Sequence, residues 1–175
     1  MRTQRSRTRT DSARSLVGFT VGEGTYAVDV PAVREILSPI ALVSVPHASS
    51  IVLGVADHRG RVVPIVDLRR RFGIPPLGSR RSKWIVVEID DRWFGLAVDD
   101  VSEVFSVVPE NQRTNPRIGP GDVAGGFSAV FAHEGKLVLV LDLRVLARAV
   151  EDDPGPVHPP ALASGSDAGA PEGGG

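Results

Sequence analysis

The feature that most constrains the fold is an internal repeat made almost entirely of strand-forming residues. Gly60–Arg69 is GRVVPIVDLR and Gly135–Arg144 is GKLVLVLDLR, and each follows a Val-x-Glu-aliphatic segment, at Val33–Ile36 and Val101–Val104. A strand-only unit of about 70 residues is too long for a solenoid repeat and too short for a propeller. A single β-barrel of about 70 residues has a thin core and is only marginally stable by itself. The repeat therefore favours two small β-barrels that pack side by side, with a groove at their seam that could hold a partner's helix.

Runs of β-branched and aliphatic residues, separated by Gly or Asp turns, predict four β-hairpins. The expected strand pairs cover residues 16–21 and 26–30, 52–56 and 61–66, 83–89 and 93–98, and 126–132 and 136–141. Pro64 lies inside one of these strands, and proline cannot donate a hydrogen bond to a neighbouring strand. It therefore predicts an edge position or a bulge.

Three helical segments are expected between and after the strands. Pro31 predicts the first turn of a helix over 31–36, and the acidic pair at 99–100 predicts one over 99–104. A closing helix is expected over 142–150 with Asp142 as its N-cap, and Asp67 is expected to cap the turn that follows it.

Both ends of the chain differ in composition from its middle. Residues 1–14 contain five Arg and no large apolar side chain after Met1, and residues 151–175 are acidic and rich in Pro, Gly and Ala. Such segments bury too little apolar surface to offset the entropy of ordering them. We expect disordered tails over 1–14 and 151–175 and a folded part over 15–150, with a first barrel over about 15–82 and a second over 83–150.

The composition and motifs argue against several classes of protein. The chain has no cysteine and no apolar run long enough for a membrane helix, so we expect a cytoplasmic protein without disulfides. Its net charge of −1 argues against a broad nucleic-acid surface. Its four His have no metal-ligand spacing, and no P-loop or Gly-x-Ser-x-Gly motif occurs. The sequence predicts no enzyme, cofactor or metal site.

Three separated motifs resemble the CheW family of chemotaxis coupling proteins. Leu53–Gly73 is similar to the family's central signature, Tyr26–Ile36 to the segment upstream of it, and Val98–Val104 to a motif of the second half. The resemblance runs from about Leu16 to Val150. It departs from the family pattern at Asp57-His58, where Asn-Leu is usual.

This resemblance implies a mostly β fold of two packed, intertwined five-stranded SH3-like barrels with short helices and a C-terminal helix. It also implies a non-enzymatic adaptor that couples chemoreceptors to a CheA-type histidine kinase. The expected partners are the kinase's regulatory domain and the cytoplasmic tip of a methyl-accepting receptor. Such an adaptor is cytoplasmic, is recruited to receptor arrays, and neither enters the membrane nor binds nucleic acid.

The resemblance also selects candidate partner-binding residues, and each has a structural alternative. The candidates are Val33, Glu35, Asp57, His58 and Arg59. Arg59 matches a position of receptor coupling, but it could instead pair with Asp57 or Asp67. Val33 could be a core residue, whereas Glu35 is expected to be exposed because charged residues are rarely buried without a partner.

Two other functions stay open at this point. A small β-barrel can bind single-stranded nucleic acid by stacking bases on exposed aromatic side chains. A CheW-like protein could also be a decoy that binds the kinase but no receptor. The basic residues between 69 and 83 could face an acidic partner or nucleic acid, although a solvated loop is the simpler interpretation.

Overall fold

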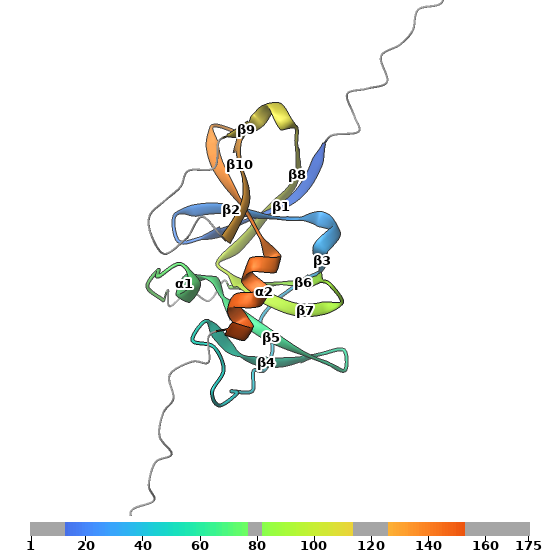
Figure 1. Ribbon diagram of the computed structural model, residues 1–175, viewed down its shortest axis with the longest axis vertical. Coiled ribbons are helices and arrows are strands. Elements are labelled where there is room, and N and C mark those ends of the chain that lie inside the picture. The colour runs from blue at the N-terminus through green and yellow to red at the C-terminus, as the bar shows by residue number, and fades with distance from the viewer. Residues whose placement is uncertain (1–12, 77–81, 114–125, 153–175) are drawn as a thin grey trace, which may run out of the picture.

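The computed structural model describes residues 13–76, 82–113 and 126–152, which form two β-sheets arranged along the long axis of the molecule (Figure 1). The six-stranded sheet has the order β8-β1-β2-β11-β10-β9, and the five-stranded sheet has the order β3-β6-β7-β5-β4. The mostly β fold of two packed SH3-like barrels is confirmed. The sixth strand is β9, which has only two residues and pairs with the edge of β10.

The chain forms four β-hairpins, with single strands and short helical elements between them. The strands of the first half are β1 (Arg14–Val21), β2 (Gly24–Asp29), β3 (Val33–Leu37), β4 (Val52–His58) and β5 (Arg61–Asp67). Those of the second half are β6 (Lys83–Ile89), β7 (Arg92–Val98), β8 (Asp100–Val107), β9 (Gln112–Arg113), β10 (Phe127–His133) and β11 (Lys136–Leu141). The short elements are η1 (Val30–Ala32), η2 (Pro109–Asn111), α1 (Leu68–Arg71) and α2 (Leu143–Asp152).

All four predicted hairpins are confirmed, and three of them close through two residues with positive φ. These pairs are Arg59 and Gly60, Asp90 and Asp91, and Glu134 and Gly135. Two consecutive positive φ angles define the type I′ turn, whose twist matches that of the flanking strands. The first residue of each turn therefore projects from the end of its hairpin.

Two of the three predicted helices are wrong. Residues 31–36 form the end of η1 and then β3, and residues 99–104 form a bend and then β8. Their β-branched and aliphatic residues pair with neighbouring strands, Ile36 with Ile85 and Val101 with Phe19. The closing helix is confirmed as α2, and Asp142 caps it by accepting hydrogen bonds from the backbone N–H groups of Arg144 and Val145.

The two sheets do not divide the chain at residues 82 and 83, so the predicted barrel boundary is wrong. The hairpin β1–β2 belongs to the sheet of β8–β11, and the hairpin β6–β7 belongs to the sheet of β3–β5. Parallel pairs join these parts, β2 with β11 and β5 with β7. The chain crosses between the sheets at η1 and again at Asp99, so each repeat places its leading hairpin in the other barrel.

Three smaller expectations can be compared with the structure. Asp67 caps α1, as predicted, by accepting from the backbone N–H groups of Arg69 and Arg70. Pro64 does not lie in an edge strand, because β5 is between β4 and β7; the pairing with β7 begins one residue later, at Ile65. Among the described residues, no helix is long and apolar enough to cross a membrane.

The predicted tails lie mostly outside the described residues, and there they stay predictions. At the boundaries the structure extends the folded part beyond 15–150. Arg14 begins β1 and donates a hydrogen bond to the carboxylate of Asp29. Glu151 lies in α2 and pairs with Arg92 at 2.7 Å.

The largest apolar core lies between the sheets and not inside either barrel. It includes Phe19 and Val28 from the six-stranded sheet and Ile85 and Leu96 from the five-stranded sheet, all of which are fully buried. Each barrel interior adds a smaller cluster of its own. Burial of apolar area is the main stabilising contribution, so each barrel covers the apolar face of the other. The helix α2 lies between the two sheets in Figure 1, and its buried residues Leu143, Leu146 and Ala147 belong to the same core.

Candidate partner-binding surface

Three of the five candidate residues meet where the five-stranded sheet closes into a barrel. The strands β3 and β4 are at opposite edges of this sheet, yet Glu35 of β3 lies against the end of the β4–β5 hairpin. Arg59 Nη2 is 3.0 Å from Glu35 Oε1 and 2.9 Å from Oε2, and His58 Nε2 is 3.1 Å from Oε2. One carboxylate therefore holds both residues at the tip of the hairpin. We call Glu35, His58 and Arg59 the hairpin cluster.

The hairpin cluster combines a buried support with an exposed charge. The side chain of His58 is 10% exposed, that of Glu35 32% and that of Arg59 76%. Asp57 Oδ1 accepts a hydrogen bond of 2.8 Å from the backbone N–H of Gly60, which stabilises the turn. Arg59 is thus held in a defined position while most of its guanidinium surface stays open to a partner.

Trp93 extends this surface on the neighbouring strand β7. The centroid of the Trp93 ring is 6.3 Å from that of the His58 ring. The guanidinium carbon of Arg61 lies 4.6 Å from the centroid of the Trp93 ring. A guanidinium over an indole face is a cation–π contact. The sequence analysis selected neither Trp93 nor Arg61; the only local signal was the position of Arg61 directly after the turn.

Val33 and Asp57 have structural roles. Val33 packs against the core between the sheets and pairs with Val87 of β6, as the alternative interpretation predicted. Asp57 is exposed, but its carboxylate is used by the turn. Arg59 pairs with Glu35, and not with Asp57 or Asp67, which were the partners of its structural alternative. Of the five candidates, three form the hairpin cluster.

Apolar side chains are exposed close to the hairpin cluster in the sequence. Val62 follows Arg61 and is 73% exposed, and Ile36 follows Glu35 and is 41% exposed. The segment that joins β3 to β4 adds Val43, which is 67% exposed. This segment is fixed to β4 by two backbone hydrogen bonds between Val43 and Val55. Exposed apolar side chains are typical of protein–protein contact surfaces.

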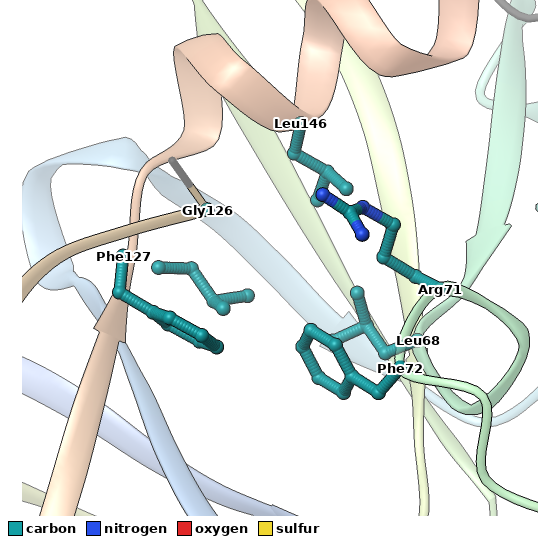
Figure 2. A pocket seen from close by; sticks show the side chains of 7 residues that line it. Leu68, Arg71, Phe72, Gly126, Phe127 and Leu146 are labelled. Carbon is teal, nitrogen blue, oxygen red and sulfur yellow. The ribbon is translucent and has the colours of Figure 1, made fainter. Parts of the chain in front are cut away.

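The seam between the barrels is largely filled. In the apolar cavity of Figure 2, Leu68, Arg71 and Phe72 from the region of α1 face Phe127 of β10 and Leu146 of α2. Its volume is about 10 Å³, which is room for no more than one water molecule. Because α2 and these side chains occupy the seam, the expected docking groove is not open on this side. A wider hollow of about 560 Å³, with Arg14, Glu88 and Arg144 in its walls, lies elsewhere between the barrels.

One aromatic group beside this cavity is titratable. Tyr26 of β2 stacks on Phe72 at a centroid distance of 4.9 Å and on Phe127 at 6.1 Å. Burial raises the pKa of its phenol. These three rings join β2, α1 and β10, so they connect both barrels and contribute to the fold.

The sequence analysis also missed a buried ion pair between the barrels. Arg69 Nη2 donates to Asp99 Oδ2 at 2.5 Å and Arg69 Nε to Oδ1 at 2.6 Å, while Asp99 Oδ2 accepts from the backbone N–H of Gly22 at 2.7 Å. The hydrogen bonds from Arg69 lower the pKa of Asp99, and those to Asp99 raise the pKa of Arg69. Arg69 therefore does not lie in a solvated basic loop; it is a buried link between α1 and the β1–β2 hairpin.

Comparison with known proteins gives a consistent result. The family model for the CheW-like domain matches residues 15–151. The chain is 34% identical over 140 residues to a chemotaxis protein CheW of Rhizobium meliloti, covering 77% of this chain and 87% of that protein. It is 30% identical over 142 residues to a probable chemotaxis protein CheW of Rhizobium etli, covering 80% and 91%.

A solved structure agrees with these matches. The crystal structure of the scaffolding protein TtCheW from Thermoanaerobacter tengcongensis superimposes with a TM-score of 0.68 at 27% sequence identity. The superposition covers 74% of this chain and 88% of that one. The residues that the family model matches include strands of both sheets and the hairpin cluster. The chain therefore belongs to the CheW-like domain family.

Proposed function

We propose that this chain is a non-enzymatic adaptor that couples chemoreceptors to a CheA-type histidine kinase. Membership of the CheW-like family supports a scaffold role in chemotaxis. The observation that carries the proposal further is the hairpin cluster, in which an exposed Arg59 is held by Glu35 beside a buried His58. Arginine is enriched among residues that dominate the binding energy of interfaces.

The hairpin cluster is the proposed contact for the cytoplasmic tip of a methyl-accepting receptor. An adaptor transmits a signal only if its contact free energy differs between the receptor's conformational states. Arg59 suits this role because its charge can form an additional ion pair with a receptor carboxylate while the hairpin that carries it stays rigid. Binding at this site is cytoplasmic and recruits the adaptor to the receptor array.

The regulatory domain of the kinase is the second proposed partner. Exposed apolar side chains occur on both barrels, with Val62 on the five-stranded sheet and Val104 and Leu137 on the six-stranded sheet. A partner of similar fold can pack against such strand surfaces with mainly apolar contacts. Two separate surfaces allow the kinase and the receptor to bind the adaptor together.

Nucleic-acid binding receives little support from the structure. Stacking of bases requires exposed aromatic side chains. All six Phe, both Trp and the one Tyr lie in the described part of the chain, and none of them is exposed. The decoy function differs from the adaptor function only in receptor binding, so one experiment separates them.

The experiment measures binding of the purified full-length chain to a receptor cytoplasmic tip and, separately, to a kinase regulatory domain. Arg59→Ala is expected to weaken receptor binding about tenfold or more, as for other arginine positions at interface centres. Its melting temperature should stay nearly unchanged, because an exposed ion pair contributes at most about 1 kcal/mol. Arg144→Ala is the matched control, since Arg144 is 63% exposed and pairs with Asp90 at 3.3 Å.

Three results would contradict the proposal. Normal receptor binding by Arg59→Ala together with a large loss of thermal stability would make Arg59 a structural residue. Kinase binding without any receptor binding by the wild-type chain would make the protein a decoy. Tight binding of single-stranded DNA with a steep salt dependence would favour the nucleic-acid function.

A further inference from the structure

The six-stranded barrel has its own cluster of side chains at the position equivalent to the hairpin cluster. Glu103 lies on β8, which corresponds to β3, and His133 and Glu134 lie at the tip of the β10–β11 hairpin, which corresponds to β4–β5. One ligand atom from each of these residues, an imidazole nitrogen or a carboxylate oxygen, lies within 4.8 Å of the others. The spacing in sequence gave no such indication, because Glu103 and His133 come from different strands.

The two clusters differ at a single position. Arg59 and Glu134 both occupy the first residue of a type I′ turn, with φ angles of 54° and 47°. In the five-stranded barrel the Arg59 guanidinium neutralises the carboxylate of Glu35. In the six-stranded barrel the same position holds a second carboxylate, so the cluster has two acidic groups around a histidine where its counterpart has a cation.

The environment of His133 adds to this comparison. Its side chain is 24% exposed, but its Nε2 atom is buried without a hydrogen bond and lies 3.5 Å from Glu103 Oε1, which is within ion-pair distance. Its ring is stacked on Phe105 of β8, with a centroid distance of 4.0 Å and an interplanar angle of 14°. The stacking fixes the ring, and a buried nitrogen without a partner carries a free-energy cost unless something binds it.

We propose that Glu103, His133 and Glu134 bind a divalent transition-metal ion of the Zn²⁺ class. One imidazole nitrogen and two carboxylate oxygens are ligands that Zn²⁺ accepts, whereas Mg²⁺ and Ca²⁺ prefer oxygen ligands alone. Three protein ligands leave one position for water or for a group of a partner. The ion links β8 to the β10–β11 hairpin, as the Arg59–Glu35 ion pair links β4–β5 to β3.

The competing explanation is a metal-free cluster in which His133 pairs directly with Glu103. The two explanations differ in a direct binding measurement. Isothermal titration calorimetry of the metal-free full-length chain with ZnCl₂ alone should give one site with a dissociation constant in the micromolar range or below. The melting temperature should rise when Zn²⁺ is added, because a ligand that binds the folded state stabilises it.

Matched variants assign the binding to these residues. His133→Ala should weaken Zn²⁺ binding at least tenfold, and Glu134→Arg should remove it, because it recreates the guanidinium–carboxylate pair of the other barrel. His58→Ala changes the equivalent histidine and should bind Zn²⁺ as the wild type does. Should His133→Ala fail to fold, Glu134→Arg decides the question. No Zn²⁺ binding by the wild-type chain, or unchanged binding by folded Glu134→Arg, would overturn the proposal.

Discussion

Replacing Asp99 by alanine tests the buried ion pair that joins the barrels. The side chain of Arg69 is only 9% exposed and that of Asp99 20%. The substitution leaves the Arg69 guanidinium in the protein interior with the carbonyl of Pro75 as its remaining hydrogen-bond acceptor in the described structure. The backbone N–H of Gly22 also loses its acceptor. Breaking a buried pair in this way costs about 3–5 kcal/mol, so we expect a loss of about 4 kcal/mol in the free energy of unfolding.

That loss is a large part of the total stability of a domain, which is about 5–15 kcal/mol. For a domain of this size, 1 kcal/mol corresponds to about 3–4 °C, so the melting temperature should fall by about 12–16 °C. Urea denaturation, monitored through the fluorescence of Trp84 and Trp93, measures the change in the free energy of unfolding directly. Both tryptophans lie in the five-stranded sheet and report on its packing.

Glu151→Ala is the matched control for this experiment. Glu151 pairs with Arg92 at 2.7 Å, but the two side chains are 55% and 50% exposed. An exposed pair contributes about 0–1 kcal/mol, so the control should unfold nearly as the wild type does. If Asp99→Ala also stays within about 1 kcal/mol of the wild type, the ion pair does not hold the barrels together.

Two further predictions concern acid stability and the connection between β3 and β4. Because the pKa of Asp99 is lowered in the folded protein, its contribution to stability is complete above about pH 5 and is lost as the pH falls below about 4. The stability difference between the wild type and Asp99→Asn should therefore be constant from about pH 5 to 7 and shrink in acid; a constant difference down to about pH 2 would contradict this reasoning. Gly54→Ala should lower the free energy of unfolding, measured by urea denaturation, by about 1–3 kcal/mol. The reason is that a Cβ at position 54, where φ is 153°, would lie 2.6 Å from the carbonyl oxygen of Val43. Wild-type stability of this variant would show that the segment between β3 and β4 can move away from β4.

Much of the fold could be predicted from the sequence because short-range signals determine hairpins. Turn pairs such as Arg59-Gly60 and Glu134-Gly135 fix both the loop and the register of the strands beside them. The helices expected at 31–36 and 99–104 do not form, because strand pairing of the β-branched residues there outweighs the helix-start signals of Pro31 and the acidic pair. The family resemblance implied intertwined barrels, but the repeat did not show which hairpins are exchanged, since it gives the order of elements and not the sheet they join.

The candidate site was predictable only in part, for a related reason. Family resemblance selected Glu35, His58 and Arg59, but the closure of the barrel is what brings β3 against the β4–β5 hairpin. Contacts across such closures join residues far apart in the chain. Arg69 and Asp99 were missed for this reason, and so was the approach of His133 to Glu103.

The most direct test of adaptor function is the assembly of receptor, adaptor and kinase in one complex. Membranes that contain the receptor are sedimented with the kinase, with and without the purified chain, and the kinase in the pellet is measured. We expect the wild-type chain to bring the kinase into the pellet, Arg144→Ala to do the same, and Arg59→Ala to recover at most about a tenth as much at limiting concentration. Equal recovery with Arg59→Ala, or no recovery with the wild-type chain, would contradict coupling through this surface.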